Sequence, residues 1–149
     1  MLCLVAAIGV YYYSSERTSG PVPERKFYYI DEATGAESVH YGTEVPPLLN
    51  ADGNPTIVRV MYYSGDGGAT KCVGYYEKFD EDGKNAYLAY LKNPHGGNAE
   101  QLERCMQNGR YLRAAAKDSP WVKADSPEAN GIMNSIRTNG GPFSMVLPK

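Results

Sequence analysis

Three tyrosine doublets, each within a run of aromatic and β-branched residues, constrain the fold of this chain most strongly. They are Tyr28/Tyr29, Tyr62/Tyr63 and Tyr75/Tyr76. Tyrosine and β-branched residues fit the half-buried surface of a pleated sheet, and consecutive side chains of a strand point to opposite faces. The doublets therefore predict three strands, in each of which one ring faces the interior and the other faces outward.

Turn residues between the apolar runs predict that these strands are antiparallel. Residues 26–30 and 36–41 flank the turn segment 31–35, which ends in a glycine. Residues 56–63 and 70–79 flank a second, glycine-rich segment. Short Gly- and Asp-containing connections between strand-forming runs are typical of β-hairpins. The first half of the chain is thus expected to form two hairpins.

The second half carries helix signals. A first helix is predicted from Asp82 to the Asn93–Pro94 pair, and a second over residues 99–107 with Asn98 as its cap. A third is predicted to begin after Ser126, its N-cap, and carries apolar residues on one face: Ile132, Met133 and Ile136. Residues 109–115 predict one more strand. The predicted fold class is α+β, with a small antiparallel sheet of about four to five strands, two to three helices on one face, and an apolar N-terminal helix before them.

Residues 1–13 form the only strongly apolar run, and no charged side chain precedes Glu16. A helix of this length rises about 20 Å, whereas the hydrocarbon core of a bilayer is about 30 Å thick. A secretory signal peptide would carry Lys or Arg before its apolar stretch, and none is present. Three interpretations stay open: the C-terminal part of a membrane span, a helix packed between subunits, or a buried core element. Tyrosines 11–13 resemble the aromatic belt of a membrane interface, which favours the anchor.

The chain is expected to contain one globular domain, because 149 residues are too few for two ordinary ones. The segment 14–24 is polar and contains Gly20, Pro21 and Pro23, a composition typical of a linker. The predicted organisation is an apolar anchor or packing helix at 1–13, a linker at 14–24, an α+β domain at 25–137 and a tail at 138–149.

The charge balance argues against a nucleic-acid partner. Lys and Arg total 15 and Asp and Glu total 17, which gives a net charge of −2. A protein that binds phosphate backbones needs a basic excess. We therefore expect no nucleic acid among the partners of this chain.

The cysteines predict a disulfide and no redox or metal site. Cys72 lies in a predicted strand and Cys105 in a predicted helix, and a bridge between them would be expected in an exported domain. Two separate buried thiols are the alternative. The chain has no C-x-x-C pair, and its two histidines, His40 and His95, do not stand at metal-ligand spacing.

Two loops resemble ligand motifs without completing them. Ser64–Lys71 is glycine-rich like a phosphate loop, but no Gly immediately precedes Lys71 and no Ser or Thr follows it. Asp80–Gly83 begins like a calcium loop and lacks the downstream acidic ligands. We interpret them as a hairpin loop and a helix start, and we predict no catalytic residues, no cofactor and no metal.

Four segments resemble envelope proteins of planctomycete-like bacteria. They are KFYYIDEATG (26–35), NPTIVRVMYYSGDGG (54–68), VGYYEKF (73–79) and SPWVKADSPEANGIMNSI (119–136). Those proteins have one N-terminal membrane span and a small exported domain. The resemblance implies this topology and implies no activity.

The function predicted from the sequence is that of a non-enzymatic, membrane-anchored accessory or structural subunit of a bacterial cell-envelope assembly. Its partners would be proteins or further copies of itself, and its globular domain would lie outside the cytoplasm. The outward ring of each tyrosine doublet, together with Arg59, is the predicted interaction surface, and Trp121 is expected in the core. Alternatives are a subunit of an extracellular filament or surface layer, with residues 1–13 packed between protomers, and a small ligand-binding domain or enzyme.

Overall fold

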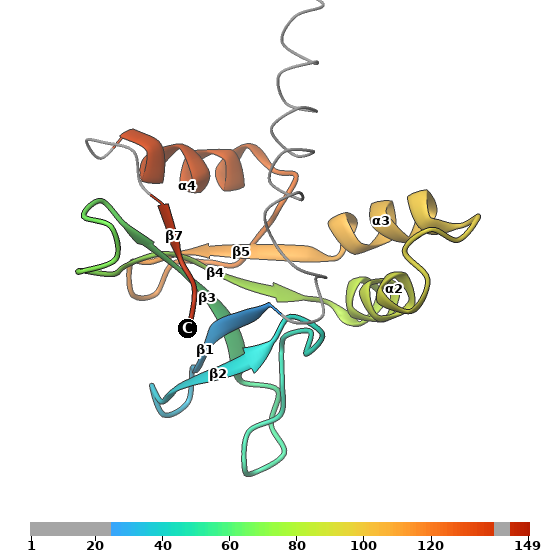
Figure 1. Cartoon of the computed structure of the whole chain (residues 1–149), viewed down its shortest axis with the longest axis horizontal. Helices are drawn as coiled ribbons and strands as arrows, with labels where there is room; N and C mark the ends of the chain where they lie inside the picture. The colour runs from blue at the N-terminus through green and yellow to red at the C-terminus, as the bar shows by residue number, and fades with distance from the viewer. Residues whose placement is uncertain (1–24, 139–143) are drawn as a thin grey trace, which may run out of the picture.

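The structure is a computed structural model that describes residues 25–138 and 144–149. These residues form a seven-stranded antiparallel sheet and three helices (Figure 1). In chain order the elements are β1 (Lys26–Asp31), β2 (Glu37–Tyr41), β3 (Ile57–Ser64), β4 (Cys72–Phe79), α2 (Glu81–Lys92), α3 (Ala99–Asn108), β5 (Arg110–Ala114), β6 (Val122–Lys123), α4 (Pro127–Thr138) and β7 (Ser144–Val146). The predicted α+β class is confirmed, and the sheet has more strands than the four to five expected.

The strands lie in the order β2-β1-β3-β4-β5-β6, and β7 also pairs with β3. β1 pairs with residues 57–60 of β3 and β7 pairs with residues 62–64, so both lie along one edge of that long strand. β6 and β7, which have two and three residues, were not among the predicted strands. Such short strands show no hydrophobic period, and β7 lies inside the segment that was assigned to a tail.

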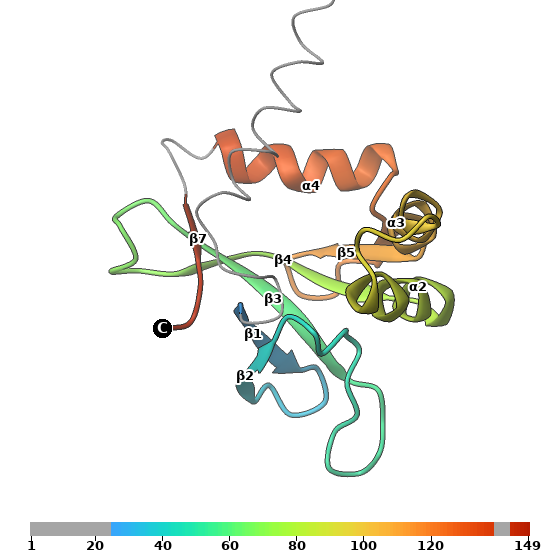
Figure 2. The same cartoon turned by 45° about the vertical axis from the view of Figure 1, so that its right-hand side comes forward.

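One face of the sheet carries α4, which runs above β4 and β5 (Figure 2). Met61, Tyr75 and Leu112 from three strands meet Ala129 of this helix in a buried apolar cluster. The apolar stripe of α4, predicted from sequence, packs against the cluster through Ile132, Met133 and Ile136. We call this side of the sheet the covered face.

The other two helices pack against each other at the end of β4 and the start of β5. Asp80 caps α2 by accepting a hydrogen bond from the backbone N–H of Gly83 at 2.8 Å. A Cβ on Gly83 would lie 2.8 Å from the Cα of Gly109, so only glycine lets the first turn of α2 touch the chain that enters β5. Asn98, expected as the cap of α3, makes no side-chain cap hydrogen bond.

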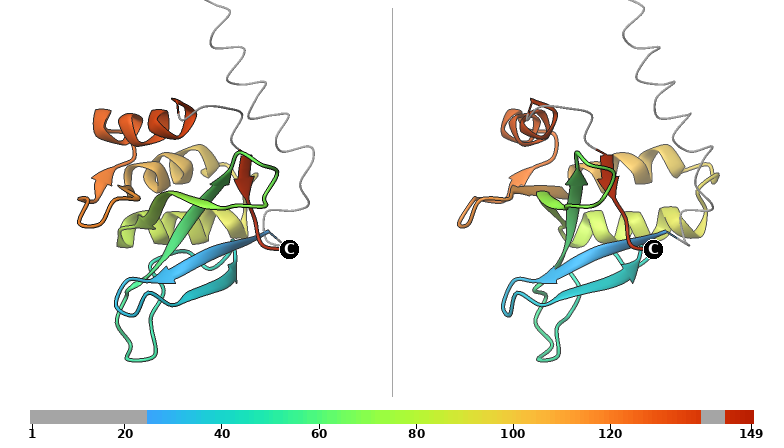
Figure 3. Two further views of the ribbon diagram at one scale, coloured as in Figure 1. Left: turned by 90° about the vertical axis from the view of Figure 1, so that its left-hand side faces the viewer. Right: turned by 60° about the vertical axis from the view of Figure 1, so that its left-hand side comes forward.

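The opposite side of the sheet is strongly curled. The β1–β2 turn and the segment after β5 lie close together in both views of Figure 3, although β3 and β4 separate these strands within the sheet. Arg113 of β5 forms an ion pair of 2.6 Å with Glu32 of that turn. The right-handed twist that each strand adds to the sheet produces such a curl. No helix of the described residues packs on this side, and we call it the helix-free face.

The predicted anchor at 1–13 and the linker at 14–24 lie outside the described residues. Among the residues that the structure does describe, no helix has both the length and the apolar character needed to cross a membrane.

Candidate functional site: the helix-free face of the sheet

Each tyrosine doublet contributes one ring to each face of the sheet. Tyr29, Tyr63 and Tyr75 lie on the covered face, and Tyr28, Tyr62 and Tyr76 lie on the helix-free face. The covered-face rings of Tyr29 and Tyr75 are 0% and 3% exposed. On the helix-free face Tyr28 and Tyr76 are half-buried, and Tyr62 is itself only 9% exposed. The predicted outward rings therefore form no bare aromatic surface.

Cations lie over the rings of the helix-free face. The ammonium nitrogen of Lys71 lies 4.1 Å from the ring centre of Tyr28 and 4.3 Å from that of Tyr62. The guanidinium carbon of Arg113 lies 4.5 Å from the ring centre of Tyr76. Such contacts favour the cation electrostatically, and the long aliphatic stems shield apolar surface while their charges face water.

Trp121, the residue before β6, completes this array of rings and cations. It was expected in the core, yet it is half-buried on the helix-free face, between Lys78 at 4.3 Å and Arg113 at 5.0 Å. Beneath the rings and stems, Val58 and Val60 are 0% and 2% exposed. Rings and the aliphatic stems of cations therefore shield these valines from water, as a packed helix shields the apolar cluster of the covered face.

An ionic cluster fixes Lys71. Its Nζ lies 2.9 Å from Oε1 of Glu37, whose Oε2 accepts a 2.6 Å hydrogen bond from the Tyr62 hydroxyl. Burial raises the pKa of Tyr62, and the hydrogen bond to Glu37 raises it further. Burial alone would raise the pKa of Glu37, but the bonds from Tyr62 and Lys71 outweigh burial and lower it. The carboxylate of Glu37 therefore stays ionised at neutral pH.

A cleft of about 370 Å³ lies between the β1–β2 turn and the segment after β5. Tyr76, Arg113, Lys117 and Asp118 are among the residues that line it. Nη1 of Arg113 pairs with Glu32, but its Nε is buried and finds no hydrogen-bond partner among the described residues. An unsatisfied buried donor is uncommon in native proteins and is a feature to be explained. The volume suits a side chain or a small group rather than a large cofactor.

Several cations around this face have no ion pair within residues 25–138 and 144–149. They are Lys26, Lys78, Lys117 and Lys123. None of these four lysines was predicted as a site residue. A ring-x-cation pattern marks Lys78 and Lys123, together with Arg113: it occurs at Tyr76–Lys78, Tyr111–Arg113 and Trp121–Lys123, and residues two apart in a strand share a face. No such pattern marks Lys26 or Lys117.

Arg59 was predicted on the interaction surface, and the structure contradicts this placement. It is 4% exposed on the covered face, where its Nη1 lies 2.8 Å from Oε1 of Glu77. Arg110 approaches the other carboxylate oxygen of Glu77 at 2.6 Å, and Arg59 donates two hydrogen bonds to the Tyr29 hydroxyl. Burial alone would raise the pKa of Glu77, but Arg110 and Arg59 lower it below its ordinary value. The strand alternation that places Tyr62 on one face places Arg59 on the other.

The predicted Cys72–Cys105 disulfide is absent from the structure. Both cysteines are free and exposed, so they are not buried thiols either. Cys72 begins β4, whose eight residues span about 23 Å. The backbone of Cys105 is hydrogen-bonded to Gly109, next to the strand that pairs with the opposite end of β4. This separation exceeds the reach of a disulfide.

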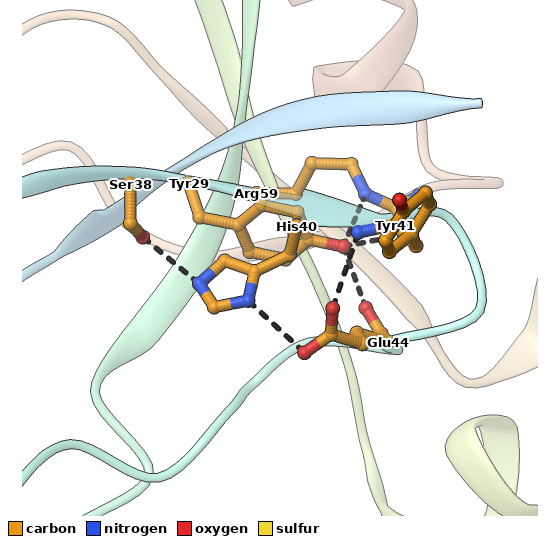
Figure 4. A network of polar contacts seen from close by, with 6 residues as sticks. All are labelled: Tyr29, Ser38, His40, Tyr41, Glu44 and Arg59. Atoms are coloured by element: carbon orange, nitrogen blue, oxygen red, sulfur yellow. Dashed lines mark hydrogen bonds and ion pairs between the residues drawn. The ribbon is translucent and has the colours of Figure 1, made fainter. Parts of the chain in front are cut away.

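A polar network lies at the edge of the covered face (Figure 4). Nε2 of His40 lies 3.0 Å from the Ser38 hydroxyl, and its Nδ1 lies 3.0 Å from Oε2 of Glu44. The Tyr29 hydroxyl donates to the backbone carbonyl of Glu44 at 2.5 Å. The order hydroxyl, imidazole, carboxylate is that of a serine-hydrolase triad. All three residues come from β2 and the turn that follows it, so the network also fixes this turn against the sheet.

The two loops with incomplete ligand motifs are tied by their own side chains. Asp66 accepts hydrogen bonds from the backbone N–H and the hydroxyl of Thr70, and Ser64 accepts one from the N–H of Gly68. Asp80 is occupied as the cap of α2. In the part of the chain that the structure describes, no group of three His, Cys, Asp or Glu side chains is arranged to hold a metal.

Fold and site together define a class: an α+β protein with a curled antiparallel sheet, one face packed by a helix and the other finished by rings and cations. Comparisons with protein-family models, with curated proteins and with solved structures find no match to this chain. They do not bear on the resemblance to planctomycete-like envelope proteins, which stays a prediction.

Proposed function

We propose that this protein is a non-enzymatic accessory or structural subunit, anchored in a membrane by residues 1–13, whose helix-free face docks onto a larger cell-envelope assembly. The observation that carries the docking part is the composition of that face. It combines half-buried rings, a cleft and cations without ion pairs, whereas α4 packs on the apolar cluster of the covered face. Tyr, Trp and Arg are the residues that most often dominate binding energy at interfaces.

The anchor part is supported by the sequence alone. Residues 1–13 are apolar and end in three tyrosines, and the linker at 14–24 would hold the domain away from the bilayer. The resemblance to single-span envelope proteins supports the same topology.

Site-specific photocrosslinking in the organism that encodes the chain tests the docking part. A photoreactive residue at Tyr111, on the helix-free face, should give discrete crosslinked products with other envelope proteins. The matched control is the same group at Leu88, which is exposed on α2. Equal crosslinking from both positions, or none from Tyr111, overturns the docking proposal.

Membrane fractionation tests the anchor part separately. Removal of residues 1–13 should move the chain from the membrane fraction to the soluble fraction. The membranes are first washed with alkaline carbonate, which strips proteins that are held only by protein contacts. A truncated chain that stays with the washed membranes overturns the anchor and leaves the docking face to be judged by crosslinking.

The network of Ser38, His40 and Glu44 favours a second candidate function, the hydrolysis of an ester. In that case the Ser38 hydroxyl would attack the carbonyl carbon, and His40, oriented by Glu44, would accept the proton and return it to the leaving alkoxide. Water would then hydrolyse the acyl-serine. A fluorophosphonate probe that labels the wild type and not the Ser38→Ala variant supports this candidate. Absence of labelling in the wild type removes it.

A further inference from the structure

We infer that the partner of the helix-free face is an acidic polypeptide segment, bound along a strip that follows β5. This inference rests on the proposed docking function and adds the chemistry of the partner. The strip consists of the cations Lys78, Arg113, Lys117 and Lys123 and the rings Tyr76, Tyr111 and Trp121.

The register of the strands places these side chains together. Tyr111 lies opposite Lys78 on one side and Lys123 on the other, so these three residues point to the same face. Arg113 is the next residue of β5 on that face, and Lys117 lines the cleft beyond it. The part of the strip on β5, from Tyr111 to Ala114, spans about 10 Å, and the strip continues into the turn that holds Lys117, so a partner segment of a few extended residues would cover it.

The charge of the strip selects an anionic partner. Three of its four cations, Lys78, Lys117 and Lys123, have no ion pair among the described residues. The three acids of the cleft are Glu32, which pairs with Arg113, Asp118, and Asp31, whose carboxylate accepts hydrogen bonds from the hydroxyls of Thr34 and Thr56. The strip therefore carries a positive excess on a chain whose net charge is −2. Complementary charge of this kind steers association and fixes the register of a partner.

The shape of the site favours a polypeptide over other anions. The face is curled, as the Arg113–Glu32 ion pair across it shows, so a flat bilayer surface does not match it. Trp121 already contacts Lys78 and Arg113 and Tyr76 contacts Arg113, which disfavours stacking of sugar rings on these side chains.

The cleft at the end of the strip suits one carboxylate side chain. The buried Nε of Arg113 lacks an acceptor, and Lys117 lines the same cleft. A Glu or Asp side chain that enters the cleft would supply that acceptor with a small displacement of the guanidinium. A charge-assisted hydrogen bond of this type is stronger than one between neutral groups.

The intrinsic fluorescence of Trp121 provides the test, because it is the only tryptophan of the chain. Full-length protein is titrated with a blocked hexaglutamate peptide and, as a control, with a blocked hexaglutamine peptide. We expect a saturable fluorescence change with hexaglutamate only, weaker at higher salt. The Lys78→Gln/Lys123→Gln double variant should bind at least tenfold more weakly. Lys123→Gln alone, which removes no ring contact of Trp121, should show part of this loss.

The matched control is Lys92→Gln, which removes an exposed charge from the last turn of α2 and should leave the affinity unchanged. Heparin and vesicles of phosphatidylglycerol are titrated in parallel. Equal binding of both peptides, equal loss in Lys92→Gln, or tighter binding of heparin or vesicles than of hexaglutamate overturns the inference. If hexaglutamate fails while Tyr111 still crosslinks to partners, the docking function stands and only the acidic chemistry of the partner is wrong.

Discussion

The two faces of this sheet exclude water by different means. On the covered face α4 packs on an apolar cluster, and beside it the buried carboxylate of Glu77 accepts hydrogen bonds from Arg59 and Arg110. On the helix-free face rings cover the valines and cation stems cover the rings. Both faces contain Tyr, Arg or Lys, and Glu, so residue type alone does not distinguish them.

The two faces differ in how far their charged side chains are exposed to solvent. On the covered face Arg59 and Glu77 are each 4% exposed, so their charged groups are shielded from water. The side chains of Lys71 and Glu37 on the helix-free face are 37% and 38% exposed, so they reach water and any partner. A buried ion pair stabilises only while it is complete, whereas an exposed pair contributes little and remains free to exchange partners.

The same substitution on the two faces gives the largest expected contrast. Glu77→Gln leaves the buried Arg59 and the half-buried Arg110 without their carboxylate, and we expect the free energy of unfolding to fall by about 3–5 kcal/mol. Glu37→Gln breaks an exposed pair, and a loss of about 0–1 kcal/mol is expected. Chemical denaturation of both full-length variants measures the difference, and similar losses would show that the two faces are energetically alike.

Acid should remove the stabilising effect of Glu77 without any substitution. Its pKa in the folded protein lies below the ordinary value of 4.5, so its stabilising contribution is present above that pH and is lost as the pH falls below it. Glu77→Gln lacks this contribution at every pH. The gap in unfolding free energy between wild type and variant should therefore narrow below about pH 4.5. Asp31 and Glu37, whose pKa values are also lowered, retain their own acid dependence in both proteins and serve as the internal control.

Local signals in the sequence predicted most of the elements. Some signals depend on only a few neighbouring residues: the turn at 31–35, the glycine-rich loop before β4 and the Ser126 cap of α4. The strands and helices that begin or end at these signals were predicted with bounds within about two residues of those in the structure. β6 and β7 exist only through pairing with distant strands, so no local pattern marks them. Likewise, Cys72 and Cys105 were paired on an assumed packing of α3 over the sheet, whereas α3 packs on α2 at its end.

The candidate site was predictable only in part. Alternation separated the rings of each doublet, but it could not say which face a helix would cover, and so Arg59 was placed on the wrong one. The cations of the strip come together through the curl of the sheet, which joins Glu32 and Arg113 from distant parts of the chain. Curl accumulates from the twist of several strands, so the residue pattern of a single strand does not reveal it.

Lys71 allows the contribution of a cation stem to be separated from that of its charge. Lys71→Ala removes both the stem over two rings and the ion pair, and we expect a loss of about 1 kcal/mol. Lys71→Met keeps most of the stem and should lose less. Lys92→Ala, at an exposed helix end, controls for the loss of a lysine. If Met and Ala at position 71 cost the same, the stem does not shield this face and the charge alone matters.

The smallest effect is expected at the cysteines, which tie neither face. In a Cys3→Ser background, Cys72→Ser and Cys105→Ser should each change the free energy of unfolding by less than about 0.5 kcal/mol, because both side chains are exposed and free. Loss of a native disulfide would cost about 2–5 kcal/mol. Both thiols should also react with a thiol reagent in the folded protein, before and after treatment with a reductant. A loss of that larger size, or thiols that react only after reduction, would mean that Cys72 and Cys105 are bridged and that α3 packs over the sheet. In that case α3 would cover part of the sheet in addition to α4.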